Sequence, residues 1–464
     1  MKIHFNGAAQ TVTGTQFHIE ANGANILLDC GLYQGKRSDF YAYNQVFNFD
    51  PRKMDALLLS HAHIDHSGNI PNLVKQGFNN PIYATRATCE LADVMLRDSA
   101  HIQESDIAYV NKKRARKGQS RLEPLYTAPD AIQATHLFQP QEYGQSFQPV
   151  EGITAKFVEA GHILGSAAIV LDINENGKKT RIWFSGDIGR EKLPLLRDPV
   201  LPTDTQILIM ESTYGDKPHR SPEAAFIEFR DIVIKTVARG GKVIIPAFAV
   251  GRTQELVYFL NIMLANKDIP AIPIYVDSPL AVNASDIFRK FSYLFDEETK
   301  KFVESGNHKA LSYPNLTYVR SVIESKALND RYEAMVIISA SGMAESGRIL
   351  HHLRNNIENP KNTIMIVSWQ APNTLGRRMA ERQKVVRIFG QLFEVNAEIA
   401  TIGGLSAHAG QDMLVKYALN SQASINNIFL VHGEHEAATA LKEKLNQHGL
   451  TSVSYPQKNQ TVEI

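Results

Sequence analysis

The sequence has few cysteines, no excess of charge of one sign and no long apolar run, and each absence excludes a class of protein. Two cysteines, Cys30 and Cys89, cannot build a disulfide framework or a cysteine-rich zinc module. Lysine and arginine total 49 against 48 aspartate and glutamate residues, and the formal net charge of +1 excludes nucleic-acid binding by bulk charge alone. Any site for a polyanion must therefore be local.

Membrane and secretory classes are excluded in the same way. The first residues, MKIHFNG, lack the apolar core of a signal peptide, and no apolar run approaches the roughly 18 residues of a spanning helix. We therefore expect a cytoplasmic protein with no membrane partner. With 464 residues, 44% of them hydrophobic and 21% charged, the chain has the composition of a globular protein and room for two or three domains.

The pattern of strands and helices changes near residue 205. Before it, short apolar strands such as 25–29 and 55–60 are separated by turns rich in glycine and aspartate. After it, strands such as 206–210 and 242–246 alternate with helices. This alternation predicts a parallel sheet covered on both faces.

Helix signals support the same division of the chain. Ser221-Pro222 is typical of a helix start, with serine as the cap and proline at the first helical position. We expect residues 1–207 and 405–464 to form one domain, and residues 208–404 to form a second, inserted α/β domain.

The segment 60–68, with the sequence SHAHIDHSG, directly follows an apolar strand. His61 and His63 are two residues apart, so in an extended segment both project to one side and can share a metal ion. Asp65 and His66 lie in the turn beyond, where they can face a second ion. The alternative is a surface histidine cluster.

Four such ligands cannot complete two metal sites, so further ligands should stand at the ends of other strands. The candidates, each following an apolar strand, are His162, Asp187 and His432. Taken singly, each is equally well explained as an ordinary turn residue. Their common position at strand ends favours metal binding.

Taken in order, these motifs resemble the metallo-β-lactamase superfamily and, within it, the β-CASP ribonucleases. Relatives in this family include bacterial and archaeal RNA-processing nucleases and the nuclease subunit of the eukaryotic cleavage and polyadenylation complex. Residues 211–215 (ESTYG), 405–408 (LSAH) and 431–434 (VHGE) resemble the three extra β-CASP motifs. The resemblance covers nearly the whole chain and implies an α/β fold: a metallo-β-lactamase αββα sandwich with an inserted parallel-sheet α/β (β-CASP) domain.

The resemblance implies two zinc ions per chain, although iron or manganese would accept the same ligand types. One ion would be bound by His61, His63, His162 and Asp187, and the other by Asp65, His66, Asp187 and His432. A hydroxide between the ions would attack phosphorus. Asp29 resembles the carboxylate that orients a ligand; a turn aspartate before Gly31 is the alternative.

The predicted catalytic residues are Asp65, His408 and Glu211. His408 would protonate the departing 3′ oxygen, a role that suits a group titrating near neutral pH, and Glu211 would orient its ring. Gly410 stands where many relatives carry an acidic residue, which puts local support of this loop in doubt. Ser406 would bind a phosphate oxygen or, equally well, cap a helix.

Three glycine-arginine pairs, at Arg252, Arg348 and Arg377, would place backbone N–H groups and a guanidinium near phosphates. Helix–sheet packing is an equal alternative for each. Together with the basic run 111–118 they would line a channel between the two domains, with the active site in the cleft, although such a run is more often only a solvated face.

The sequence therefore predicts a two-zinc ribonuclease that hydrolyses single-stranded RNA and leaves a 5′-phosphate. Three rivals remain: a hydrolase of a small ester, thioester or lactam, a DNA nuclease, and an inactive RNA-binding subunit. The first leaves the inserted domain without a role, and the last would lack metal ligands that are present here. A homodimer is a further expectation.

Overall fold

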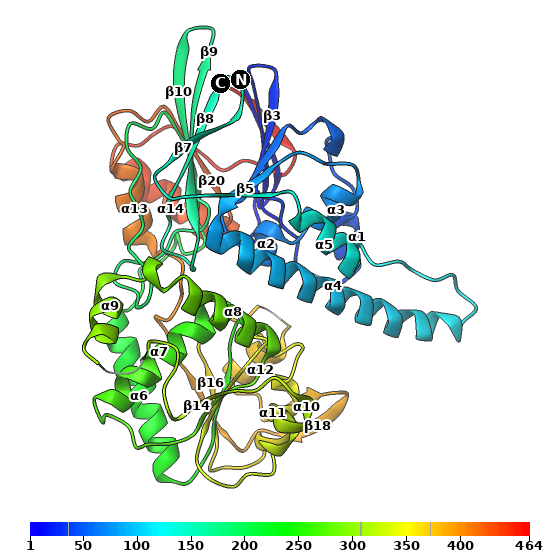
Figure 1. The fold of residues 1–464 in the computed structure, drawn as a ribbon, viewed down its shortest axis with the longest axis vertical. Helices are drawn as coiled ribbons and strands as arrows, with labels where there is room; N and C mark the ends of the chain where they lie inside the picture. Colours follow the sequence, from blue (N-terminus) through cyan, green and yellow to red (C-terminus); the bar gives the residue numbers. More distant parts are fainter. Residues whose placement is uncertain (36, 307–308, 372) are drawn as a thin grey trace. The chain divides into compact units, whose positions relative to one another are not determined.

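A computed structural model describes residues 1–35, 37–306, 309–371 and 373–464 (Figure 1). It contains two compact units. The first comprises Met1–Glu191, Asp198–Pro218 and His408–Ile464, and the second comprises Lys192–Arg197 and His219–Ala407. The boundary expected at 207 thus falls inside a segment of the first unit, Asp198–Pro218, because residues 207–211 form a strand that pairs within that unit.

Two sheets build the first unit, each seven-stranded within the described residues. The order of the first sheet is β22 (Gln460–Glu463), β1 (Lys2–Gly7), β2 (Gln16–Ala21), β3 (Ala24–Leu28), β4 (Ala56–Leu58), β5 (Ile82–Thr85) and β6 (Phe138–Gln141). The order of the second is β21 (Val453–Ser454), β20 (Asn427–Val431), β11 (Ile207–Glu211), β10 (Lys178–Phe184), β9 (Ala167–Glu175), β8 (Ile153–Glu159) and β7 (Ser146–Val150).

The two sheets pack face to face through the side chains that alternate inward along each strand. Aromatic contacts join them: the ring centroids of Phe17 and Phe184 are 5.5 Å apart, and those of Phe5 and Phe429 are 5.1 Å apart. In β11, Ile207 and Ile209 enter this shared core, whereas Leu208 and Met210 face the helices on the other side. This period of two is what a strand buried on both faces requires.

Helices cover the outer faces, which gives the first unit its αββα layers (Figure 1). They are α1 (Arg37–Asn44), α2 (Ile64–Ser67), α3 (Ile70–Lys75), α4 (Arg86–Ala115), α5 (Ala128–Thr135), α13 (Gln411–Leu419) and α14 (His435–Gln447). The basic run lies at the end of the 30-residue α4 and is largely exposed. Among the described helices, none combines the length and the apolar character needed to cross a membrane.

A parallel sheet forms the middle of the second unit, six-stranded in the part of the chain that is described. Its order is β14 (Leu316–Tyr318), β13 (Ile274–Val276), β15 (Val336–Ser339), β12 (Val243–Pro246), β16 (Thr363–Ile366) and β19 (Glu398–Thr401). A separate antiparallel pair comprises β17 (Val385–Ile388) and β18 (Gln391–Glu394). The parallel arrangement predicted from strand–helix alternation is therefore present.

Most helices of the second unit begin after a serine, threonine or aspartate that caps them. The helices are α6 (Pro222–Ala238), α7 (Arg252–Ala265), α8 (Pro279–Lys290), α9 (Glu297–Glu304), α10 (Val322–Ala327), α11 (Ile349–Asn356) and α12 (Leu375–Ala380). Of these, α7 and α11 lack such a side-chain cap. The predicted start at Ser221-Pro222 is confirmed, since the Ser221 hydroxyl accepts a hydrogen bond from the backbone N–H of Ala224 at 3.2 Å.

Candidate metal centre

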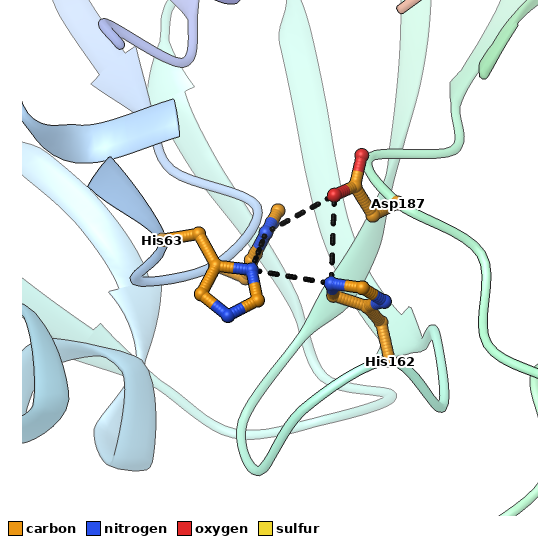
Figure 2. Close-up of side chains that lie close together, drawn as sticks. His63, His162 and Asp187 are labelled. Carbon is orange, nitrogen blue, oxygen red and sulfur yellow. Dashed lines mark hydrogen bonds and ion pairs between the residues drawn. The ribbon is translucent and has the colours of Figure 1, made fainter. Parts of the chain in front are cut away.

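Four side chains from three loops of the first unit converge with their metal-binding atoms facing one another. His61 and His63 follow β4, while His162 lies between β8 and β9 and Asp187 follows β10. One ligand atom from each of the four lies within 4.8 Å of the others. Figure 2 shows His63, His162 and Asp187 pointing toward one another. These are the residues that the sequence proposed for the first ion.

Within this group the closest atoms are ring nitrogens. His63 Nδ1 lies 3.1 Å from His61 Nε2 and 3.2 Å from His162 Nε2. Asp187 Oδ2 lies 3.5 Å from the Nε2 atoms of both His61 and His162. Lone pairs directed at one point repel each other unless a cation lies between them, so the geometry fits a metal ion.

A second group forms beside the first. It contains Asp65, His66 and His432, whose ligand atoms also lie within 4.8 Å of one another. His432 Nε2 is 3.4 Å from Asp65 Oδ2, and His66 Nε2 is 3.2 Å from Asp187 Oδ1. Asp187 thus directs one oxygen toward each group, the position that a bridging carboxylate needs. Its Oδ1 is buried and accepts no hydrogen bond from the described residues.

Burial sets the protonation of these groups. Burial and the neighbouring histidines lower the pKa of His61 and of His162 well below the ordinary value, so both rings are neutral. Although burial opposes ionisation of Asp187, the surrounding histidines hold its pKa well below the usual range. Neutral imidazoles beside an ionised carboxylate are the state in which these side chains bind a metal.

His66 is the exception. Burial lowers the pKa of its ring, but Asp187 and Asp29 raise it and together place it well above the ordinary value. The two carboxylates therefore draw positive charge to this point, which a metal ion would supply in place of a proton.

Asp29 binds the ring nitrogen of His66 that faces away from Asp187. Its Oδ2 accepts hydrogen bonds from His66 Nδ1 and from the Ser60 hydroxyl, both at 2.7 Å, and its Oδ1 accepts one from the Ser60 backbone N–H at 2.6 Å. The bond to Nδ1 leaves Nε2 of His66 directed at Asp187. This is the orienting position that the sequence suggested for Asp29.

Two residues of this site were missed by the sequence analysis. Ser60 supports Asp29 as described above, and the Thr213 hydroxyl lies 3.2 Å from His432 Nδ1. Each stands directly beside a motif that was recognised, Ser60 before His61 and Thr213 two residues after Glu211. Proximity to those motifs was the available signal.

His408 and Glu211 form a separate pair at the edge of the metal-binding groups. Glu211 ends β11, and both of its carboxylate oxygens lie 3.1 Å from His408 Nδ1. His408 Nε2 lies 3.9 Å from Asp187 Oδ2. Burial lowers the pKa of His408, but Glu211 and Asp187 outweigh burial and raise it to about 9. The ring can therefore hold a proton beside the candidate metal centre.

The predicted phosphate-binding side chains lie in the second unit, where each of the three arginines forms an ion pair with a carboxylate. Arg252 is buried and pairs with Glu255, and Arg348 pairs with buried Asp277 at 2.6 Å. Arg377 forms a partly exposed pair with Glu381 at 2.7 Å. For Arg252 and Arg348 this arrangement matches the packing alternative. Ser406 is half-buried at the end of the second unit.

Family models match three stretches of the chain. A metallo-beta-lactamase superfamily domain matches residues 18–182, a Beta-Casp domain matches residues 253–379, and a Zn-dependent metallo-hydrolase RNA specificity domain matches residues 393–456. Ribonuclease TTHA0252 of Thermus thermophilus is 36% identical over 97% of this chain and 97% of its own length. The chain belongs to the β-CASP ribonuclease family.

Other similarities agree. Transcription termination factor FttA of Methanocaldococcus jannaschii is 31% identical over 94% of this β-CASP chain and 67% of its own length. A protein of unknown function from Enterococcus faecalis shares the fold, with a TM-score of 0.53, 12% identity and 99% coverage of both chains. The predicted family, fold class and metal-dependent hydrolase activity are thereby confirmed. The identity and number of the metal ions stay predictions.

Proposed function

We propose that this β-CASP protein is a two-zinc ribonuclease that hydrolyses phosphodiester bonds of single-stranded RNA. Support comes from its relatives, which include a protein named as a ribonuclease, an RNase J-like protein and a probable RNase, and from the Zn-dependent metallo-hydrolase RNA specificity domain that its sequence matches. One ion would be held by the first group, His61, His63, His162 and Asp187. The other would be held by the second group, Asp65, His66 and His432, together with Asp187. When bound, the ions supply Lewis acidity and an activated water.

The observation that carries the proposal is the position of His408. Its Nδ1 is fixed by Glu211, so its Nε2 faces the metal-binding groups and can carry the proton that the departing 3′ oxygen needs. Water as the attacking group would leave the phosphate on the 5′ side of the downstream product.

Cleavage of a single-stranded RNA labelled separately at each end tests the proposal. The experiment uses wild type, His408→Ala and the control His435→Ala, whose side chain is exposed and follows His432 by three residues. We expect about two zinc ions in each protein, cutting by wild type and control, and a loss of about 100-fold to 10,000-fold in kcat for His408→Ala. Equal rates in all three would refute the general-acid assignment.

A matched DNA strand and a panel of small esters separate the rivals. Preference for DNA would make the protein a DNA nuclease of the same family. If the metal-loaded protein cuts neither strand but hydrolyses a thioester, the protein is a small-substrate hydrolase and the nuclease proposal is wrong. A homodimer and a cytoplasmic location are parts of the same proposal, which sedimentation and cell fractionation would test.

A further inference from the structure

The first unit contains a cavity of about 370 Å³ that is separate from the metal-binding side chains. Its walls come from the loop between β1 and β2, from the segment around Tyr33, from the end of α1 and from Lys458 near the end of the chain. Three features of this cavity point to one class of ligand.

The first feature is an aromatic wall. The ring centroids of Tyr33 and Tyr43 are 4.4 Å apart, and Tyr43 is 44% exposed. Asn44 fixes this pair, because its Oδ1 accepts a hydrogen bond from Tyr33 N at 2.8 Å and its Nδ2 donates one to Tyr33 O at 3.0 Å. An exposed ring, Tyr43, held against half-buried Tyr33 in this way is suited to contact a planar base.

The second feature is a cation with no counter-ion. Lys458 Nζ lies 3.7 Å from the centroid of the Tyr43 ring, and none of the described carboxylates forms an ion pair with it. Partial burial lowers the pKa of this amine, because the Tyr43 ring offsets only part of the hydration that the charged form loses. A phosphate would provide the missing negative charge.

The third feature is an unused acceptor. Asn69 lines the cavity and is buried, and its Nδ2 donates to the backbone oxygen of Asn44 at 3.1 Å. Its Oδ1 has no hydrogen-bond partner among the described residues. A buried acceptor without a partner is costly, and a nucleobase N–H would satisfy it once the Asn69 side chain turns its Oδ1 into the cavity.

The cavity is tied to the metal centre through the backbone. Ala8, in its wall, accepts a hydrogen bond from the N–H of His432 at 2.7 Å. Gly31, also in its wall, comes so close to Asp65 that a Cβ on this glycine would lie 1.7 Å from the Asp65 backbone oxygen. A ligand in the cavity would therefore sit beside the second metal-binding group.

We propose that this cavity binds a nucleotide unit, with the base against Tyr33 and Tyr43 and the phosphate on Lys458. The nucleotide unit would belong to the RNA strand that is being cut, a short distance from the scissile bond. This part of the proposal rests on the proposed ribonuclease function. A free nucleotide offers the same chemistry, and the experiment below separates the two sources.

Binding of adenosine 5′-monophosphate to the full-length protein, measured by calorimetry, tests the cavity itself. We expect Tyr43→Leu and Lys458→Gln each to weaken this binding about fivefold or more, since base stacking and phosphate contacts are each worth at least that factor. Tyr43→Phe and Lys458→Arg should retain it. The matched controls are Tyr332→Leu, at a tyrosine that is 94% exposed, and Lys179→Gln, at an exposed lysine of β10.

Steady-state cleavage identifies the source of the nucleotide. If it belongs to the strand, Tyr43→Leu and Lys458→Gln raise KM for a 20-nucleotide RNA about fivefold, leave kcat unchanged, and leave hydrolysis of bis(p-nitrophenyl) phosphate and the metal content unchanged. Weakened nucleotide binding with an unchanged KM would assign the cavity to a free nucleotide.

Nucleotide affinity that is unchanged in both variants would overturn the proposal, provided that their melting temperatures match wild type. Wild-type protein that binds the monophosphate but cuts no RNA would refute the proposed function and leave the cavity assignment standing. The two ideas can therefore fail separately.

Discussion

The two units contain nearly the same small arrangement of side chains with different consequences. In the first unit, Asp29 follows β3 and binds His66 at 2.7 Å and the Ser60 hydroxyl at 2.7 Å. In the second, Asp277 follows β13 and binds His352 at 2.6 Å and the Ser325 hydroxyl at 2.5 Å. Both aspartates are fully buried. An aspartate, a serine and a histidine therefore do not by themselves define a functional site.

The difference lies in what the second ring nitrogen of each histidine meets. His66 Nε2 faces Asp187, whose Oδ1 accepts no hydrogen bond from the described residues, whereas His352 Nδ1 lies 3.2 Å from the side-chain oxygen of Asn329. Asp277 is also neutralised by Arg348, which in turn donates to the backbone oxygen of Arg320 at 2.7 Å. The first arrangement leaves a carboxylate oxygen without a partner and suits a metal ion. In the second, the carboxylate and both ring nitrogens have protein partners, and the arrangement stabilises the fold.

Removal of the metal is the change with the largest expected effect. Asp187→Ala or treatment with a strong chelator should abolish phosphodiester cleavage, because the only carboxylate facing both groups, among the described residues, is lost or left without ions. Added zinc should restore the chelated wild type but not the variant. Metal analysis with the cleavage assay checks this, and full activity without metal would contradict it.

Loss of Asp277 should act on stability instead. Asp277→Ala leaves the half-buried Arg348 and the buried His352 without their carboxylate partner, which costs about 3 kcal/mol of unfolding free energy, the low end for breaking a buried pair. Hydrogen exchange should show faster opening of β13 and α11 while the metal content of folded protein stays normal. Arg377→Ala is the control, since its exposed pair with Glu381 is worth about 0.3 to 0.5 kcal/mol.

Loss of the Asp29 carboxylate should have an effect of intermediate size, on metal binding and reaction rate and not on stability. Asp29→Asn keeps the size of the side chain but weakens the hold on His66, so we expect metal affinity or kcat to fall about 10-fold to 100-fold. Zinc titration of the metal-free protein measures the first and RNA cleavage the second. Unchanged affinity and rate would mean that Asp29 is only a turn residue.

The smallest expected effect concerns pH. Burial raises the pKa of Asp277, but hydrogen bonds from His352, Ser325 and Arg348 outweigh burial and hold the pKa below the ordinary value. The stabilisation is therefore present above about pH 3.9, the pKa of a free aspartate, and is lost as pH falls through the lower folded-state pKa. Protection of β13 in wild type should approach that of Asp277→Asn as pH falls from about 5 to 2. A constant difference would exclude this linkage.

The sequence predicted the parts of this protein that depend on local patterns. A strand followed at once by a polar residue pointed to His162, Asp187 and His432, and the structure brings all three together. Arg348 was different, because its partner Asp277 lies 71 residues away and no local pattern connects them. Ser60 was missed for the same reason, since the carboxylate that it supports is 31 residues earlier in the chain.

The order of the candidate site along the chain has a consequence for biosynthesis. His61 through Asp187 precede the second unit, whereas His408 and His432 follow it, and β22 near the end pairs with β1. During translation the second unit emerges and can fold before the first unit acquires His408 and His432, the proposed proton donor and metal ligand. A nascent chain of this protein therefore cannot assemble the complete candidate site until the segment after the second unit has been synthesised.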